Sequence, residues 1–375
     1  MKDVDKVCRP AIMTLDDYKP GTTIEEVERE LGLSDIVKLS ENENPYGMSA
    51  RALEAILVEL PRASQYPEHG FYDLIHALAA ANGVKESMVV AGQGAEALVQ
   101  LVPEMFVNPG DEVILADITY SRYLQASRLM DASVVVVPLR DYRHDLQAIA
   151  KAVTPRTKLI WVCSPNNPTG TIVYRREVRA FLDFLPPSVL VVFDQAYSEF
   201  VDDPEYADGI EFLKQGYENV LVLRTFSKAH GMAGLRLGYC IGSSAVCNLL
   251  NRIREPFNVN RLAIVASQAS LADRDFVGQC VERIRLGREY LTAEFIRLGM
   301  DPVPSQANFV LVDTKQDADA LFKRLLARGG IVRPASGWGL DTFLRVSVGR
   351  PEQNERIVSL LEQESRVVSL LEQGQ

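Results

Sequence analysis

Lys228 is the residue whose sequence surroundings most clearly suggest a catalytic role. It lies in the stretch TFSKAHGMAGLRLGY (225–239), which follows the apolar run VLVLR, and Ser227 and Arg236 share its glycine-rich loop. A solvated charge fits poorly there, because exposed lysines usually lie on polar helix faces. A lysine amine whose pKa is lowered by burial and a nearby cation can form an imine with an aldehyde. The loop is therefore a candidate for covalent chemistry.

A glycine turn, GQGAEA (92–97), offers a second candidate site between a predicted strand and a predicted helix. The free N–H groups at a helix N-terminus bind anions, so we expect the amides of Ala95 and Glu96 to hold a phosphate. The turn also fits a weak dinucleotide fingerprint, G-x-G-x-x-A, with Asp117 further along. A nicotinamide enzyme would leave Lys228 unexplained, and a turn without a ligand is the remaining alternative.

Two more loops follow apolar runs that read as strands. SPNNPTG (164–170) follows KLIWVC, and DQAYSEF (194–200) follows SVLVVF, which puts Asp194 at the carboxyl end of a strand. Each could be only a turn or a helix cap. Ligands of α/β sheets bind beyond the carboxyl ends of the strands, so we expect these loops, the Lys228 loop and the glycine turn to meet at one crevice.

A lysine, an acid and a phosphate cradle together point to one cofactor. An aspartate beside a pyridine nitrogen keeps that nitrogen protonated and makes the ring an electron sink. The cofactor that carries an aldehyde, a pyridine ring and a phosphate is pyridoxal 5'-phosphate. We therefore expect Lys228 to form the imine, Asp194 to pair with the pyridinium, and Ser227, Arg236 and the two amides to bind the phosphate.

The elements that must position these residues form an α/β pattern. Short apolar runs without period-two alternation alternate with helical patterns from residue 88 to about 275, which predicts a mostly parallel sheet covered on both faces. We expect three parts: an N-terminal arm and short helix (1–40) that pack with the small domain or a partner subunit, a large cofactor-binding domain (41–275), and a small α+β domain (276–375). The repeated VSLLEQ at 368–373 is expected to extend a tail rather than the core.

Composition narrows the class of protein. The 375 residues are 47% hydrophobic with a net charge of −10 and no Lys/Arg-rich run, which disfavours nucleic-acid binding. The five cysteines form no C-x-x-C pair and the four histidines lack metal-ligand spacing, so we expect no metal site and a reducing compartment. No apolar run reaches membrane-spanning length, and the charged N-terminus lacks a signal sequence. We expect a cytoplasmic protein.

Taken together, SPNNPTG, D-x-A-Y, TFSKA-x-G-x-AGLR-x-GY and LRVSVG resemble the fold-type I pyridoxal-phosphate aminotransferases across nearly the whole chain. ENENPYG (41–47), QYPEHG (65–70), REPFNVN (254–260), ANFVLV (307–312) and residues 330–349 are similar, in order and spacing, to segments of histidinol-phosphate aminotransferases. The resemblance implies a seven-stranded sheet in the large domain and a homodimer with shared active sites. It also implies amino transfer between histidinol phosphate and 2-oxoglutarate in histidine biosynthesis.

The same resemblance implies roles for single residues. Asn167 and Tyr197 would hydrogen-bond the cofactor's phenolic oxygen, and Tyr120 would stack on its ring. Tyr66 would reach the cofactor phosphate of the neighbouring subunit. The residues expected to bind substrate are Arg345, as the anion clamp, with Arg333, Tyr18 and Asn44.

Three positions depart from the family pattern: Gln195 replaces a common glutamate, and His230 and Trp338 each replace a common tyrosine. Trp338 could alter the substrate pocket. The alternatives are an aromatic amino acid aminotransferase and a threonine-phosphate-type decarboxylase on the same scaffold. A nicotinamide oxidoreductase ranks lower because it would leave Lys228 unexplained. A non-catalytic cofactor-binding protein ranks lower because the chain retains Lys228, Asp194, Tyr197, Asn167 and Arg236.

Overall fold

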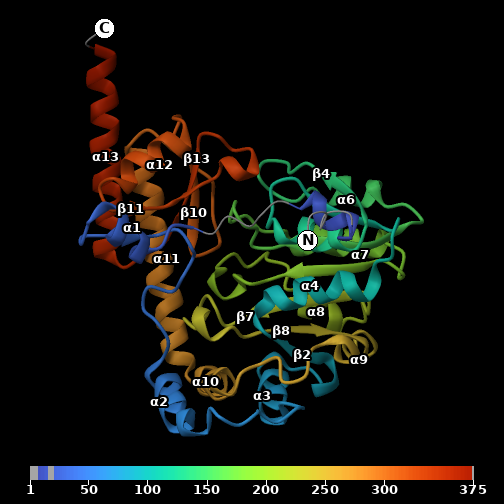
Figure 1. Cartoon of the computed structure of the whole chain (residues 1–375). Helices are drawn as coiled ribbons and strands as arrows, with labels where there is room; N and C mark the ends of the chain where they lie inside the picture. The colour runs from blue at the N-terminus through green and yellow to red at the C-terminus, as the bar shows by residue number, and fades with distance from the viewer. Residues whose placement is uncertain (1–6, 16–20, 374–375) are drawn as a thin grey trace.

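The structure is a computed structural model that describes residues 7–15 and 21–373. For residues 365–373 it describes the backbone alone. Its centre is a seven-stranded sheet in the order β2-β8-β7-β6-β5-β3-β4 (Figure 1). The strands are β2 (Val89–Gly92), β3 (Glu112–Ala116), β4 (Ser133–Val137), β5 (Thr157–Cys163), β6 (Leu190–Asp194), β7 (Val220–Thr225) and β8 (Gly238–Gly242). β8 runs antiparallel to both of its neighbours, and the other pairs are parallel. The predicted mostly parallel sheet is confirmed.

Both faces of this sheet are covered, as continuous apolar strands require. Val191 and Phe193 of β6 pack in one apolar cluster, whereas Leu190 and Val192 pack in another on the opposite face. The first cluster includes residues of α2 (Ala50–Glu59), α3 (Tyr72–Asn82), α6 (Leu146–Ala152), α7 (Arg175–Phe184), α8 (Gly209–Lys214) and α10 (Arg261–Ala272). The second includes residues of α4 (Gly94–Phe106), α5 (Arg122–Leu129) and α9 (Ser244–Ile253).

A smaller antiparallel sheet stands beside the large one in the order β12-β13-β10-β9 (Figure 1). Its strands are β9 (Asp301–Pro302), β10 (Phe309–Asp313), β12 (Arg333–Pro334) and β13 (Phe343–Ser347), accompanied by α11 (Arg274–Arg297), α12 (Ala318–Leu326) and α13 (Pro351–Gln373). The division of the chain into an arm, a large domain and a small domain, with boundaries after residues 40 and 275, stays a prediction. The second VSLLEQ continues α13, which extends beyond the small sheet in Figure 1, and its side chains lie outside those described.

The N-terminal segment contacts both parts of the molecule. Helix α1 (Ile24–Leu31) begins with a capping box between Thr23 and Glu26. After it, β1 (Val37–Lys38) pairs in parallel with β11 (Gly330–Ile331) of the C-terminal part. Nearer the start of the chain, Arg9 donates a 2.6 Å hydrogen bond to the carbonyl of Leu129 at the end of α5. No helix in the described ranges is both long and apolar enough to cross a membrane.

Candidate active site

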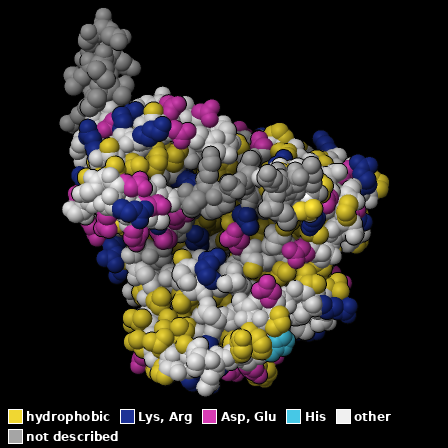
Figure 2. All heavy atoms as spheres, viewed as in Figure 1, with side chains coloured by type: hydrophobic (Ala, Val, Ile, Leu, Met, Phe, Trp, Pro, Cys, Tyr) yellow, Lys and Arg dark blue, Asp and Glu magenta, His cyan; other side chains and the backbone are white. Residues whose placement is uncertain are grey.

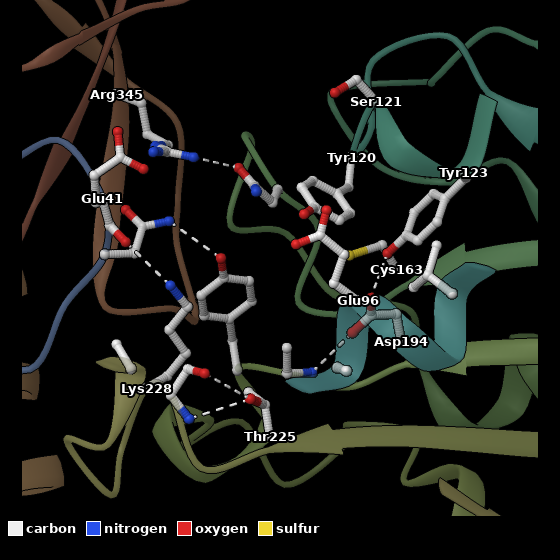
Figure 3. Close-up of a pocket in the computed structure, with 18 of the residues that line it drawn as sticks. Glu41, Glu96, Tyr120, Ser121, Tyr123, Cys163, Asp194, Thr225, Lys228 and Arg345 are labelled. Carbon is white, nitrogen blue, oxygen red and sulfur yellow. Dashed lines mark hydrogen bonds between the residues drawn. The ribbon is translucent and has the colours of Figure 1, made fainter. Parts of the chain in front are cut away.

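A cavity of about 210 Å³ lies where β5, β6 and β7 end, at their carboxyl ends. It is the crevice that the loop positions predict. The cavity brings together most of the candidate residues: Ala95, Glu96, Tyr120, Asn167, Asp194, Tyr197, Ser227, Lys228, Arg236, Arg333 and Arg345. Figure 3 shows several of them as side chains that face one another across the cavity.

Lys228 projects from the loop after β7. The hydroxyl of Thr225 accepts a 3.1 Å hydrogen bond from the Ser227 amide, which turns the chain sharply at the strand end. The Lys228 Nζ atom donates a 3.0 Å bond to the backbone carbonyl of Glu41. Burial, and after it the charge of Arg345, lowers the pKa of Lys228 from 10.5 to about 8. A substantial fraction of this amine is therefore neutral near physiological pH and available as a nucleophile or base.

Asp194 ends β6 and is buried. The Tyr123 hydroxyl donates a 2.6 Å hydrogen bond to its Oδ2 atom, and the Ala196 amide donates a 3.1 Å bond to Oδ1. Burial raises the pKa of Asp194, and the bond from Tyr123 acts in the opposite direction. A cationic ring nitrogen placed against this carboxylate would lower the pKa of Asp194, and the carboxylate would keep that nitrogen protonated.

An anion cradle is built where α4 begins. Gly94 has φ of +73°, and its amide donates a 3.1 Å hydrogen bond to the carbonyl of Arg236. The Arg236 guanidinium in turn lies 3.4 Å from the Ser227 hydroxyl. Gly238 lets β8 pack on this turn, because a Cβ atom there would lie 2.2 Å from the amide nitrogen of Ala95. A helix N-terminus, a guanidinium and a hydroxyl therefore meet where a phosphate can bind.

Tyr197 and Asn167 come from the loops after β6 and β5. The Tyr197 hydroxyl accepts a 3.1 Å hydrogen bond from the Asn42 amide, and burial raises the pKa of this phenol. The Asn167 Oδ1 atom accepts a 2.6 Å bond from Arg345. We propose that the Tyr197 hydroxyl and the Asn167 amide nitrogen hold an oxygen of a bound ring.

Arg345 and Arg333 are directly opposite each other in the register of β13 and β12. Cross-strand partners project from the same face of a sheet, so both side chains reach the cavity. Besides Asn167, Arg345 donates to the carbonyl of Ser40. Its guanidinium lies over the rings of Phe309 and Trp338, 5.5 and 5.8 Å from their centres. This orientation is fixed by packing, and the pair could clamp an anionic group.

Two candidate residues lie elsewhere. Tyr66 is 79% exposed and stacks on Phe257, with 4.8 Å between the ring centres. Asn44 donates a 2.9 Å bond to the carbonyl of Ala229 and lines a neighbouring hollow rather than this cavity. Tyr18 lies outside the described residues.

The departures from the family pattern have structural explanations. Gln195 is fully buried, donates a 2.9 Å bond to the carbonyl of Ala207 and accepts from the Gly209 amide. His230 contacts the Ser270 hydroxyl at 2.8 Å, and burial lowers its pKa to about 4, so the ring is neutral. Trp338 alone lines the cavity, where its indole N–H donates a 2.8 Å bond to the carbonyl of Thr119.

Three further residues of the site are not among those predicted from the sequence. Tyr123 holds Asp194, Asn42 holds Tyr197, and the Glu41 side chain lines the cavity. Tyr123 lies 71 positions from its partner, and no sequence pattern links the two. Asn42 carried a usable signal, because Asn tolerates the left-handed conformation that it adopts, with φ of +55°.

The arrangement fits pyridoxal 5'-phosphate. A buried amine, a buried carboxylate and an anion cradle line the same cavity, and no single ligand group would need all three. Lys228 would hold the aldehyde carbon, Asp194 the pyridine nitrogen, and Ser227, Arg236 and the start of α4 the phosphate. The donor set therefore matches the cofactor that the sequence predicts.

Comparisons with known proteins agree with this assignment. The sequence model of the family described as aminotransferase class I and II matches residues 34–361. The histidinol-phosphate aminotransferase of Moorella thermoacetica is 46% identical over 354 residues, which cover 94% of this chain and 92% of the relative. That of Brevibacillus brevis is 42% identical over 345 residues, which cover 92% of this chain and 94% of the relative.

Solved structures share the fold. The histidinol-phosphate aminotransferase of Sinorhizobium meliloti, in complex with pyridoxal-5'-phosphate, superposes with a TM-score of 0.88 at 27% identity, covering 96% of this chain and 97% of that one. The L-threonine-O-3-phosphate decarboxylase of Porphyromonas gingivalis superposes with a TM-score of 0.78 at 26% identity, covering 88% and 99%. A common scaffold thus serves more than one reaction in these proteins.

Replacing Lys228 by Met should stabilise the cofactor-free protein by an amount that depends on pH. The folded-state pKa, about 8, lies below the ordinary value of 10.5. The buried ammonium therefore destabilises the fold fully below pH 8 and not at all above pH 10.5, where the amine is neutral in both states. From pH 7.5 to 10.5, urea unfolding should show the variant's advantage shrinking by up to about 3 kcal/mol.

The exposed Lys85→Met variant is the control for this titration. A Lys228→Met advantage that stays constant over the whole pH range would contradict the burial effect.

Proposed function

The chain belongs to the class I and II aminotransferase family and depends on pyridoxal phosphate, and from that premise we propose that it transfers an amino group between L-histidinol phosphate and 2-oxoglutarate. This reaction supplies a step of histidine biosynthesis. The observation that carries the proposal is the Arg333–Arg345 pair at the cavity wall, which offers two guanidinium groups to one anionic group. The names of the two relatives compared above support the same substrate.

The chain's own residues divide the work. When bound, the cofactor supplies an electron sink for the substrate's α-carbon. The Nζ atom of Lys228, with its lowered pKa, would take the proton from that carbon as general base and, as general acid, deliver it to the cofactor carbon that had carried the aldehyde. Asp194 holds the pyridine nitrogen protonated, and Tyr197 and Asn167 orient the ring through its phenolic oxygen. Tyr120 lines the cavity where it can stack on the ring.

We expect the substrate's anionic group to bind to Arg345 and Arg333. Histidinol phosphate carries a phosphate where an amino acid carries its α-carboxylate, so one site must accept both groups. Arg345 can form a bidentate pair with either, and Arg333 adds the second charge that a phosphate needs. Tyr18 and Asn44 are proposed to complete this site, Asn44 by holding the loop around Ala229 in place.

We also propose a homodimer whose subunits share their active sites. Tyr66 does not line its own subunit's cavity, so its hydroxyl can serve a cofactor phosphate only in a neighbour. Hydrophobic side chains gather over α2 at the lower left of Figure 2. The exposed ones on α2 and just after it are Leu53, Leu57, Val58 and Leu60. A second copy that covers this patch is the occupant that we expect.

A cytoplasmic location is part of the proposal. Its support is that all five cysteines are free thiols, four of them buried, as expected in a reducing compartment.

Replacing Arg333 by Leu should lower kcat/KM for L-histidinol phosphate by about tenfold or more, because a charge-assisted contact to the phosphate is lost. Turnover of L-phenylalanine, which carries only a carboxylate, should fall less. Steady-state kinetics with both donors measure the difference, and the exposed Arg29→Leu serves as the matched control. Unchanged constants for the phosphate substrate would remove Arg333 from the site.

Mixing two inactive or weakened variants tests the shared site. A dimer of one Lys228→Ala subunit and one Tyr66→Ala subunit contains one site with both residues intact, because Lys228 and Tyr66 come from different chains. After exchange of subunits, activity should exceed the average of the two parent proteins. If activity equals that average, with exchange verified by mass spectrometry, Tyr66 does not act across the interface.

A further inference from the structure

Glu41 places a carboxylate in the active cavity, and the proposed chemistry gives it no role. The side chain follows β1, lines the cavity and is 32% exposed. Its backbone carbonyl accepts the hydrogen bond from Lys228, which fixes the residue beside the reacting amine (Figure 3). The Glu41 carboxylate is therefore held where it can contact a substrate.

The described residues leave one oxygen of this carboxylate without a hydrogen bond. The Oε1 atom is buried and accepts no hydrogen bond from any described residue. The nearest cation, the Nη1 atom of Arg333, is 4.0 Å away, which is too far for a hydrogen bond. Gly21 covers the same atom, since a Cβ atom there would lie 2.0 Å from it. A buried acceptor without a donor costs about 1–3 kcal/mol, so its presence in a cavity points to a donor on the ligand.

The other acids of the cavity have partners. Asp194 accepts hydrogen bonds from Tyr123 and Ala196, and Glu96 forms a 2.8 Å ion pair with Arg122. The cations that line the cavity are Lys228, Arg236, Arg333 and Arg345. These suit the phosphate and carboxylate groups of cofactor and substrates, and Glu41 suits a different group, one that donates a hydrogen bond or carries positive charge.

We propose that Glu41 accepts a hydrogen bond from the imidazole ring of the amino substrate and thereby selects this ring over a phenyl ring. The inference rests on the proposed function, because histidinol phosphate is the substrate that carries an imidazole. Arg345 and Arg333 take its phosphate, and Glu41 takes its ring. A site built to hydrogen-bond a ring N–H rejects an analogue that lacks it, since the buried acceptor stays unpaired.

The pH dependence of binding carries the signature of this contact. A carboxylate favours the imidazolium form, so affinity is highest below the ordinary imidazole pKa of about 6.5 and declines as pH rises through it. The charged groups around Glu41 are Arg333 from β12, Arg345 from β13, and Lys228. Nearby Glu43 pairs with Lys38 at 2.9 Å. L-phenylalaninol phosphate carries the same amine and phosphate as histidinol phosphate but has a phenyl ring. The titration of the amine and the phosphate therefore affects both affinities equally and cancels in their ratio.

The test measures binding of both phosphates to the Lys228→Ala protein loaded with pyridoxal phosphate, which cannot complete turnover. Calorimetry from pH 5.5 to 8 should give an affinity ratio that favours histidinol phosphate and falls with rising pH. Adding Glu41→Gln should reduce the ratio at pH 5.5 by about tenfold and make it independent of pH. Glu43→Gln is the matched control, and should leave the ratio unchanged.

Equal weakening of both ligands by Glu41→Gln, or a pH dependence that persists in it, would overturn the role of Glu41. Glu41→Ala provides a second variant, and the absorbance of the bound cofactor shows that each variant is folded and loaded. Failure of the proposed function would give a different result, because the wild-type enzyme would then turn over other amino donors but not histidinol phosphate. If the wild type accepts histidinol phosphate and the ratio survives both substitutions, the inference about Glu41 alone is wrong.

Discussion

Enclosure of the Lys228 amine in a cavity lined by arginines is the constraint on which the rest of the site depends. Burial and the charge of Arg345 lower its pKa to about 8. The positive groups are held by neutral acceptors: Lys228 by the carbonyl of Glu41, Arg345 by Asn167 and a backbone carbonyl, and Arg236 by the carbonyl of Ala233. These positive groups line the cavity, where they can contact the phosphate and carboxylate groups of bound molecules.

The fold meets this constraint by dividing the charges among elements. The large sheet supplies the amine, the acid Asp194 and the anion cradle from the ends of neighbouring strands, whereas β12 and β13 of the small sheet bring in Arg333 and Arg345. Trp338 and Arg345 connect the two parts, because the indole bonds to Thr119 and the guanidinium to Asn167. The cavity thus lies between the two sheets, and its shape depends on how they pack.

Much of the fold and cofactor site could be predicted, because it follows from local patterns. Unbroken apolar runs indicate strands covered on both faces, and the loops that follow them must meet at one sheet edge. The contacts that orient the side chains could not be predicted in this way. Tyr123 meets Asp194, and Trp338 meets Thr119, only through packing between segments far apart in sequence. The direction of the Glu41 carboxylate is likewise a result of packing, and the proposed role of Tyr66 needs a second chain.

The measurement that tests the central claim most directly is the absorbance spectrum of the purified protein before and after L-histidinol phosphate is added without any oxo acid. The account predicts that the visible absorbance of the cofactor bound to Lys228 disappears and then returns when 2-oxoglutarate is added. Visible absorbance that histidinol phosphate leaves unchanged would contradict the proposed substrate, while the cofactor and the fold would stand. Absence of any cofactor absorbance in protein loaded with pyridoxal phosphate would contradict the site itself.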